Sequence, residues 1–396
     1  MTKTTPSNND RRKQVRVLHV LGSLDPGGVE TWLLNVLKYA DKDIFQFHFC
    51  TCGANVGLYA AEVEKLGGRV IRCPKDLTLR SFQHTFTRIL REGNYDILHS
   101  HVYFFSGILL RWANKEGVPI RIAHSHTSRD DRPDTYARRC YRALMRSWIN
   151  RYATSGLAAS KLAAVELFGK NWSADRRFRV IRCGIDLGAF QEPVDRIAVR
   201  NGIGIPLSAP VVGHVANFLP AKNHSFILEI ATQILKRRPE IHFLLVGDGP
   251  LRPRIQAEAT ARGLSNHMHF IGTRTDVPSL MRGAMNFYLF PSLNEGFGVS
   301  LLEAQMAGLD CVVSDTVPRE VSYFPEHIEF IPLSAGIEHW AKRVIGKIDL
   351  LSSKPISIPN DDTLDRISIQ RSVRDLTNIY LTAQTPRIPV TAEQHA

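Results

Sequence analysis

The sequence predicts an α/β protein built from two doubly wound parallel-sheet domains in tandem. The chain has 396 residues, more than one hydrophobic core usually holds, so two domains are expected. Short β-branched runs alternate with amphipathic stretches for most of the length, which is typical of β-α-β winding. A segment rich in proline and glycine interrupts this alternation at residues 185–210, and such composition indicates an interdomain connection.

Each half of the chain contains five expected strands. In the first half they cover residues 15–21, 45–51, 96–101, 120–124 and 178–184. In the second half they cover residues 211–216, 242–247, 269–273, 286–292 and 310–315. The expected domains span 1–190 and 191–362, followed by a closing helix at 363–383 and a flexible tail at 384–396. Ligands of open parallel sheets bind beyond the carboxyl ends of the strands, so we expect a substrate cleft between the domains.

The composition is that of a folded intracellular protein. Apolar residues make up 44% of the chain and charged residues 22%, close to the average for globular domains. The six cysteines form no CxxC pair, which fits a reducing compartment and argues against a cysteine metal site. No apolar run reaches the length of a membrane span, and the polar first residues do not resemble a secretory signal. We therefore expect a cytoplasmic protein.

The positive charge is concentrated in the first half of the chain. Residues 1–190 contain 30 Lys and Arg against 17 Asp and Glu, whereas the remainder is nearly balanced. A basic domain can face a membrane surface, a phosphate-bearing substrate or nucleic acid, or can simply be solvated.

Seven arginines lie within residues 129–154. At helical spacing this stretch gathers an apolar side made of Tyr141, Leu144, Met145, Trp148 and Tyr152. Such a helix could lie on an anionic membrane, bind an acceptor's pyrophosphate, or pack on the core.

The stretch LFPSLNEGFGVSLLEAQMAG, residues 289–308, has the most specific chemical pattern in the chain. It predicts a strand, a loop that presents Glu295 and two glycines, and a helix that begins near Val299 and carries Glu303. Backbone amides at a helix N-terminus bind phosphate, glycines allow close approach, and carboxylates accept hydrogen bonds from sugar hydroxyls. The pattern therefore indicates a nucleotide-sugar site.

These residues resemble the E-x7-E motif of the retaining glycosyltransferases of family 4, which have the GT-B fold. Further segments resemble the same family in the same order: GSLDPGGVE at 22–30, DILHSH, IAHSHT, AASKLAAVELFG at 158–169, VIRCGIDLGAF at 180–190 and VGDGPLRPRIQ at 246–256. The resemblance covers nearly the whole chain. It implies a GT-B architecture, with two Rossmann-like domains facing a cleft.

The resemblance also implies roles for individual residues. Glu303 matches the carboxylate that binds the ribose hydroxyls of the donor, and Glu295 matches the one that contacts the transferred sugar. The donor diphosphate would be cradled by the backbone of Gly296, Phe297, Gly298, Val299, Ser300 and Leu301. Lys222, in HVANFLPAKNHSF, matches the phosphate-binding lysine. Where the family usually has Gly-Arg this chain has Ala216-Asn217, and an asparagine at 217 cannot supply the positive charge.

Two HSH triplets, at 99–101 and 124–126, lie at the ends of expected strands. Four neighbouring histidines could in principle form a metal site. The resemblance implies instead that a histidine after the second of these strands lies near the anomeric carbon. His126 fits that place better than His124, and His101 is expected to line the cleft. The only D-x-D triplet, Asp41-Lys42-Asp43, is read as a turn. We expect neither a metal nor any other cofactor.

The turn in GSLDPGGVE places Gly27 and Gly28 at the start of a helix, although its spacing matches neither a P-loop nor G-x-G-x-x-G. Facing Glu295 and Glu303, these glycines are expected to form the first domain's wall of the cleft. There the missing side chains would let donor phosphates or the sugar approach backbone amides. We expect both to contact substrate.

The predicted function is transfer of a sugar, with retention, from a donor expected to be UDP-linked to a saccharide or lipid-linked acceptor. Members of the family with similar motifs imply exopolysaccharide or surface-glycan assembly. Peripheral contact with the inner face of the cytoplasmic membrane is expected through the basic domain, and no nucleic acid is expected. Three alternatives are a nucleotide-sugar epimerase of the same shape, a nucleic-acid- or membrane-binding protein, and a relative that has lost activity.

Overall fold

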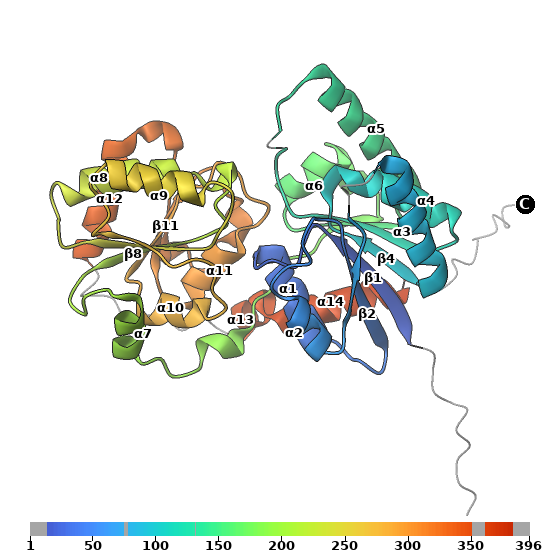
Figure 1. Ribbon diagram of the computed structural model, residues 1–396, viewed down its shortest axis with the longest axis horizontal. Helices are drawn as coiled ribbons and strands as arrows, with labels where there is room; N and C mark the ends of the chain where they lie inside the picture. The colour runs from blue at the N-terminus through green and yellow to red at the C-terminus, as the bar shows by residue number, and fades with distance from the viewer. Residues whose placement is uncertain (1–13, 75–77, 131, 351–360, 383–396) are drawn as a thin grey trace, which may run out of the picture.

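The computed structural model describes residues 14–74, 78–130, 132–350 and 361–382. Two lobes lie side by side, each a parallel sheet with helices on both faces; helix α13 (Asp361–Ile367) lies at their junction and α14 (Ile369–Thr382) continues along the first domain (Figure 1). This arrangement confirms the predicted fold class of two Rossmann-like domains that face each other.

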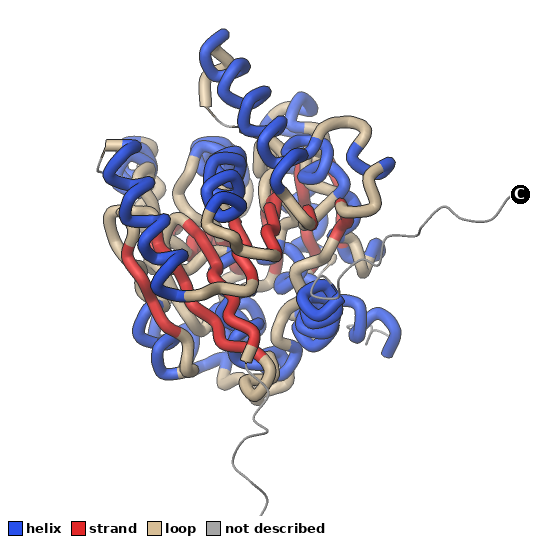
Figure 2. The backbone as a smooth tube through the Cα atoms, turned by 90° about the vertical axis from the view of Figure 1, so that its right-hand side faces the viewer, coloured by secondary structure: helices blue, strands red, loops and turns tan. Residues whose placement is uncertain are grey.

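The first domain contains a seven-stranded parallel sheet with the order β3-β2-β1-β4-β5-β6-β7. Seen from the side of this domain, its strands form a twisted layer between helices (Figure 2). The strands are β1 (Val15–Leu21), β2 (Phe45–Thr51), β3 (Arg69–Arg72), β4 (Ile97–Ser100), β5 (Ile120–Ser125), β6 (Ser155–Ala158) and β7 (Phe178–Val180). The helices are α1 (Gly28–Tyr39), α2 (Ala60–Lys65), α3 (Leu79–Gly93), α4 (Ser106–Lys115), α5 (Tyr136–Tyr152) and α6 (Lys161–Phe168).

The second domain contains a six-stranded parallel sheet with the order β10-β9-β8-β11-β12-β13. Its strands are β8 (Val211–Val215), β9 (His242–Val246), β10 (Met268–Phe270), β11 (Phe287–Phe290), β12 (Asp310–Ser314) and β13 (Ile328–Ile331). Its helices are α7 (Arg196–Ile203), α8 (His224–Leu235), α9 (Arg252–Ala261), α10 (Val277–Gly283), α11 (Val299–Met306) and α12 (Ile337–Asp349). In both sheets the strand order reverses next to the first strand of the domain, and this is where ligands bind in such folds.

Nearly all of the central strand residues are buried, because helices cover both faces of each sheet. One core lies between the first sheet and helices α3 to α6, and a second lies between the other sheet and helices α8, α9 and α12. A third core continues from the first domain into the second, and it includes residues of α1, α10, α11 and α14. One apolar core is therefore continuous between the two domains.

The chain crosses between the domains twice, and the two crossings are hydrogen-bonded to each other. The amide of Ile185 donates to the Ile367 carbonyl, and the amide of Ile369 donates to the Ile185 carbonyl, each at 2.8 Å. A Cβ on Gly184 would lie 2.1 Å from the Ser368 carbonyl oxygen, so only glycine fits there. After this crossing α14 packs against α1 in the first domain.

The predicted strands correspond to ten strands of the structure, although some ends differ. Strand β7 ends at Val180 rather than at 184, and β10 covers Met268–Phe270 rather than 269–273. The sequence analysis missed β3, β6 and β13. The strand β3 carries an arginine at each end and β6 reads SGLA, so neither shows the apolar alternation used to find strands.

The structure adds detail to two predictions about the connections. Residues 185–210 are more than a linker, because they contain a 3-10 turn (Leu187–Phe190) and the helix α7. The closing helix expected at 363–383 is two helices, α13 and α14, because the pairing with Ile185 interrupts the helix at Ser368. The predicted tail lies outside the described residues.

The basic stretch at 129–154 forms α5, and most of its expected apolar side faces the core. Met145 is buried, and Tyr141, Trp148 and Tyr152 pack against the core from partly buried positions. Leu144 was expected on the same apolar side, but 48% of this residue is exposed. None of the helices that the structure describes is both long enough and apolar enough to span a bilayer.

Candidate active site

A cavity of about 720 Å³ lies between the two domains, where the carboxyl ends of both sheets meet. Its walls come from the first domain's glycine turn and His126, and from the second domain's loops after β8, β9, β10 and β11. Its described lining contains five carboxylate side chains against two basic ones: Glu30, Glu62, Asp186, Glu295 and Glu303 against Lys222 and Arg274. The predicted cleft is therefore present, and its walls are rich in carboxylates.

Two helices begin at this cavity, one from each domain. Helix α1 has Gly27 as its N-cap and α11 has Gly298, and neither N-cap provides a side-chain hydrogen bond. The first amides of a helix have no partner within the helix, and they carry a partial positive charge. Gly298 has φ +91°, a conformation that favours glycine. Both helix N-termini thus lie at the cavity; that of α11 is suited to an anionic group, whereas at α1 a backbone amide is already bonded to the Glu30 carboxylate.

Lys222 and Glu295 form an ion pair in the second domain's wall. The Lys222 ammonium lies 2.6 Å from Glu295 Oε1, and the Ser292 hydroxyl donates to the same oxygen at 2.8 Å. Only 7% of the Glu295 side chain is exposed, against 22% of Lys222. Backbone bonds fix the two loops, because the Leu293 amide donates to the Ala221 carbonyl at 2.7 Å. The phosphate-binding lysine and the sugar-binding carboxylate of the sequence prediction are thus held side by side.

Two other carboxyl groups in the cavity have raised pKa values. Burial raises the pKa of Glu303 to about 7. Burial also raises the pKa of Glu30 to about 7, against the opposing effect of a backbone hydrogen bond. Both groups therefore change charge near neutral pH.

Glycines bring the two domains into close contact at the cavity. A Cβ on Gly296 would lie 1.9 Å from the His126 carbonyl oxygen of the other domain. A Cβ on Gly28 would lie 3.4 Å from the Val299 side chain, whereas one on Gly27 would lie 2.5 Å from Glu30 Oε2. Gly296 and Gly28 hence permit contact between domains, and Gly27 leaves room for a carboxylate of its own domain.

Replacing Gly28 by valine is expected to impair sugar transfer more than donor binding. An alanine Cβ fits at 3.4 Å from Val299, but the two further methyl groups of valine would press against it and hold the domains apart. The kcat and the donor dissociation constant of Gly28→Val should be compared with those of Gly28→Ala, the matched control. Equal loss of both quantities in a folded Gly28→Val protein would contradict this expectation.

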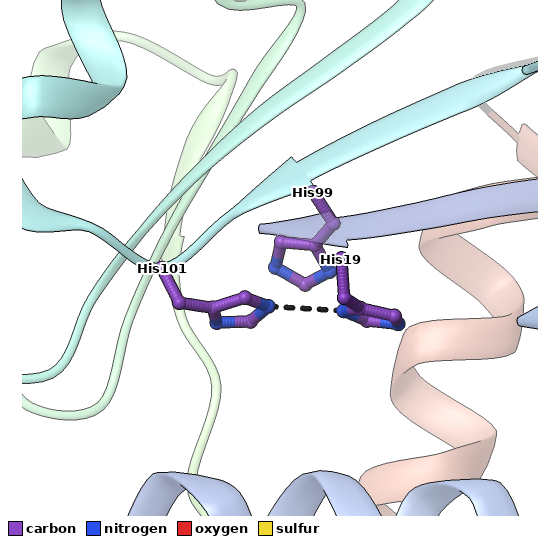
Figure 3. Close-up of side chains that lie close together, drawn as sticks. All are labelled: His19, His99 and His101. Carbon is purple, nitrogen blue, oxygen red and sulfur yellow. Dashed lines mark hydrogen bonds between the residues drawn. The ribbon is translucent and has the colours of Figure 1, made fainter. Parts of the chain in front are cut away.

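Behind the cavity, five histidines of the first domain form one cluster, in which two hydrogen-bonded groups meet through ring contacts; the His124 and His126 ring centroids lie 3.9 Å apart. The histidine cluster consists of His19, His99, His101, His124 and His126. Nitrogens of His126 and His101 lie 2.9 Å apart, those of His101 and His19 lie 3.0 Å apart, and those of His99 and His124 lie 3.2 Å apart. Figure 3 shows His101 bonded to His19, with His99 next to them at the end of its strand. His99 Nδ1 also lies 2.7 Å from the Tyr380 hydroxyl, so the returning helix α14 completes the cluster.

Burial keeps these imidazoles neutral. It lowers the pKa of His19 and of His126 to about 3. Burial, followed by the neighbouring histidines, also lowers the pKa of His99, His101 and His124 well below the usual range. At neutral pH each ring therefore has one N–H and one lone pair available for hydrogen bonds or for a metal.

Most of the predicted site residues line the same cavity. They are Gly27, Gly28, His126, Asn217, Lys222, Glu295, Gly296, Phe297, Gly298, Val299, Ser300 and Glu303. Three others do not line it. Leu301 is buried in the core, His124 is fully buried behind His126, and His101 lies beside His126. Of His124 and His126, only His126 lines the cavity.

Several residues of this region were not assigned to the site from the sequence, among them Glu30, Arg274 and His19. Glu30 and Arg274 line the cavity, and His19 bonds to His101. Arg274 follows β10 and pairs with Asp276 at 2.6 Å. Its position shortly after a strand end could have identified it as a cleft residue. His19 occupies an ordinary strand position, and only the pairing of β1 with β4, which places it opposite His99, brings it into the cluster.

Comparison with known proteins places this geometry among sugar transferases. Residues 26–189 match the family described as Glycosyltransferase Family 4, and residues 195–331 match the family described as Glycosyl transferases group 1. EpsF of Bacillus subtilis (strain 168), which is named for a glycosyltransferase activity, is 33% identical over 378 residues, covering 93% of this chain and 96% of its own. CapH of Staphylococcus aureus, named as a capsular polysaccharide biosynthesis glycosyltransferase, is 24% identical over 93% of this chain and 99% of its own.

Among solved structures, HepE of Anabaena in complex with UDP and glucose has a similar fold. Its TM-score is 0.73 at 18% identity, and the match covers 93% of this chain and 100% of that one. At this identity the comparison supports the arrangement of the two domains.

Proposed function

The chain belongs to glycosyltransferase family 4, and from this premise we propose that it moves a sugar from a UDP-linked donor to a saccharide or lipid-linked acceptor. Family membership favours a transferase over the nucleic-acid-binding alternative. The name of CapH supports a role in exopolysaccharide or surface-glycan synthesis. The HepE complex with UDP and glucose supports a donor that carries a uridine nucleotide. The anomeric configuration of the sugar would be retained.

The observation that carries the proposal is the convergence of two helix N-termini, Lys222 and Glu303 on one cavity. The amides from Gly296 to Leu301 would hold the donor diphosphate, with Lys222 as its cation. Glu303 would accept hydrogen bonds from the ribose hydroxyls. Arg274 is the other cationic side chain of the described lining, and it would supply the charge that Asn217 lacks. These groups would stabilise the leaving diphosphate without a bound cation.

The transferred sugar would lie between Glu295 and His126, which approach the cavity from opposite domains. Glu295 would accept hydrogen bonds from sugar hydroxyls, and His126 would contact the sugar near its anomeric carbon. The acceptor oxygen forms the new bond to that carbon on the face from which the diphosphate oxygen departs. The departing oxygen takes the acceptor's proton, so no protein base is required.

A thermal-shift panel of UDP-, GDP- and ADP-sugars tests the donor assignment. A ligand that binds only the folded state raises the melting temperature, so we expect the largest shift with a UDP-sugar. Removing divalent cations with EDTA should leave this shift and the rate of transfer unchanged. The proposal fails if no nucleotide sugar stabilises the protein, or if a UDP-sugar incubated alone yields an epimer and no acceptor is ever glycosylated.

Donor affinity should depend on pH through Glu303. Because the pKa of Glu303 is raised to about 7, the group is mostly ionised at pH 8 and mostly protonated at pH 6. Only the ionised form accepts hydrogen bonds at both oxygens, so the dissociation constant should rise about tenfold as pH falls from 8 to 6. Calorimetry with a UDP-sugar, whose diphosphate does not titrate in this range, measures the effect.

Two variants separate Glu303 from Glu30, whose pKa is also raised to about 7. Glu303→Gln should bind donor weakly and with little dependence on pH, whereas Glu30→Gln should keep the dependence. The reverse pattern would assign the titration to Glu30 and contradict the ribose-binding role of Glu303.

We also propose that the first domain meets its acceptor at the inner face of the cytoplasmic membrane. On α5, Tyr136 is 77% exposed and Leu144 48%, and on α6 Leu162 is 49% exposed. Arg139 is exposed on the same helix α5. Apolar groups among arginines suit an anionic interface. Wild-type protein should sediment with anionic vesicles more than Leu144→Glu does, and equal sedimentation of both would exclude this surface.

A further inference from the structure

We propose that His101, His124 and His126 form a binding site for one divalent transition-metal ion of the zinc class at the base of the cavity, and that the ion excludes the donor sugar. The site itself rests on the structure alone. The exclusion rests on the proposed function, because it requires the sugar to lie at His126.

Ring nitrogens of the three histidines already lie close together. Each of them offers one ring nitrogen, and these three nitrogens lie within 4.8 Å of one another. Nitrogens of His101 and His126 lie 2.9 Å apart. Two nitrogen ligands on a tetrahedral zinc ion lie about 3.3 Å apart, since each Zn–N bond is about 2.0–2.1 Å. Small rotations of the rings would therefore complete a three-histidine site.

The hydrogen bonds prepare His124 as a ligand. Its Nδ1 faces His99 at 3.2 Å, and His99 in turn faces the Tyr380 hydroxyl at 2.7 Å. His124 Nε2 is buried and has no hydrogen-bond partner among the described residues. If His124 donates from Nδ1 to His99, a lone pair is left free at Nε2; the opposite tautomer would bury an unpaired N–H, which is costly. The series of hydrogen bonds from His124 through His99 to Tyr380 resembles those that orient metal-binding histidines in other proteins.

The surroundings suit a cation in the absence of donor. Imidazole nitrogens are ligands that zinc, copper and nickel accept, and each of the three rings offers one. His126 lines the cavity, which gives the ion a path of entry and leaves a position open for water. The carboxylates of the same cavity outnumber its two described basic groups.

Two groups of three histidines could bind the ion, and His101 belongs to both. His19, His99 and His101 also bring their ring nitrogens within 4.8 Å, but neither His19 nor His99 lines the cavity, and both are fully buried. We therefore assign the ion to the triad that includes His126, with His99 and Tyr380 as positioning residues.

Calorimetry with Zn²⁺ on the donor-free, full-length protein tests the site. We expect one ion per chain, and binding at least about 100-fold weaker in His124→Ala. Tyr380→Phe removes one outer hydrogen bond and should weaken binding about tenfold. The matched control is His269→Ala, because His269 lies in the second domain, outside the histidine cluster, where its Nε2 lies 2.8 Å from His242 Nδ1, and this variant should bind Zn²⁺ as the wild type does.

A second measurement does not depend on activity. Co²⁺ added in place of Zn²⁺ should give the visible absorption of a tetrahedral ion in the wild type and in His269→Ala, and none in His124→Ala, with melting curves confirming that each variant is folded. The proposed site is wrong if wild-type protein binds no metal, or if His269→Ala is the variant that loses it.

Competition separates the site from its effect on donor binding. A UDP-sugar should weaken Zn²⁺ binding, and UDP alone should weaken it much less, because only the sugar reaches His126. If the metal binds at the triad but the UDP-sugar does not compete, the exclusion is refuted while the site stands. If no metal binds and transfer is still observed, the site is refuted and the proposed function stands.

Discussion

Replacing Gly296 by alanine is expected to reduce kcat by about 100-fold or more while leaving both domains folded. The new Cβ would lie 1.9 Å from the His126 carbonyl oxygen, whereas real Cβ atoms essentially never come within 3.0 Å of such an atom. The two loops must therefore separate by more than about 1 Å, and a misplacement of that size at a reacting centre can cost about 100-fold in rate. Donor bound mainly to the second domain should be affected less than about tenfold in affinity.

Single-turnover kinetics and donor calorimetry on Gly296→Ala test this expectation. Gly22→Ala is the matched control, since a Cβ on Gly22 would meet nothing within 4 Å. Wild-type transfer rates in Gly296→Ala would show that the contact between Gly296 and His126 is not needed for catalysis. A protein that has lost donor binding and rate together would place the defect in the donor site alone.

Replacing Lys222 by methionine is expected to lower kcat/KM by about 10²- to 10³-fold, the cost of removing one strong stabilising group from a leaving anion. Lys222 lies at the cavity and already pairs with Glu295 at 2.6 Å. Its removal withdraws the cation from the diphosphate and also leaves the carboxylate of Glu295, 7% exposed, without its ionic partner. Lys222→Arg keeps the charge and should retain more activity.

A double variant distinguishes the two roles of Lys222. If the lysine serves only to neutralise Glu295, then Lys222→Met combined with Glu295→Gln should restore donor affinity. If it binds the diphosphate, affinity should stay low in the double variant. Arg274 is 42% exposed and held by Asp276, so Arg274→Gln should cost less, about tenfold. If Arg274→Gln lost more activity than Lys222→Met, Arg274 rather than Lys222 would be the main cation for the diphosphate.

The local patterns of the chain predicted the parts of the site that depend on neighbouring residues. The glycines and carboxylates of residues 295–303 are brought together by one loop and the first turns of α11, so their spacing is visible in the sequence. The same holds for Gly27 and Gly28 at the start of α1. Helix N-termini and strand ends are local features, and their chemistry follows from the backbone.

Contacts between distant segments could not be predicted in this way. Arg274 follows a strand end, but only the tertiary structure shows that it lines the cavity. His19 is part of the histidine cluster only because β1 pairs with β4. The position of Leu144 shows the same limit, because helical spacing placed it on the apolar side of α5, yet the core covers only the neighbouring positions.

The sequence by itself therefore determined the two-domain α/β fold, the glycine-containing loop before α11 and the glycine turn before α1, because strand alternation and helix starts depend on consecutive residues. Only the tertiary structure decided that Gly296 touches His126, that Lys222 pairs with Glu295 across 73 residues, and that Tyr380 reaches His99 across 281. The physical reason is that such contacts depend on strand order and on the packing of the returning helix, and neither leaves a local pattern in the chain.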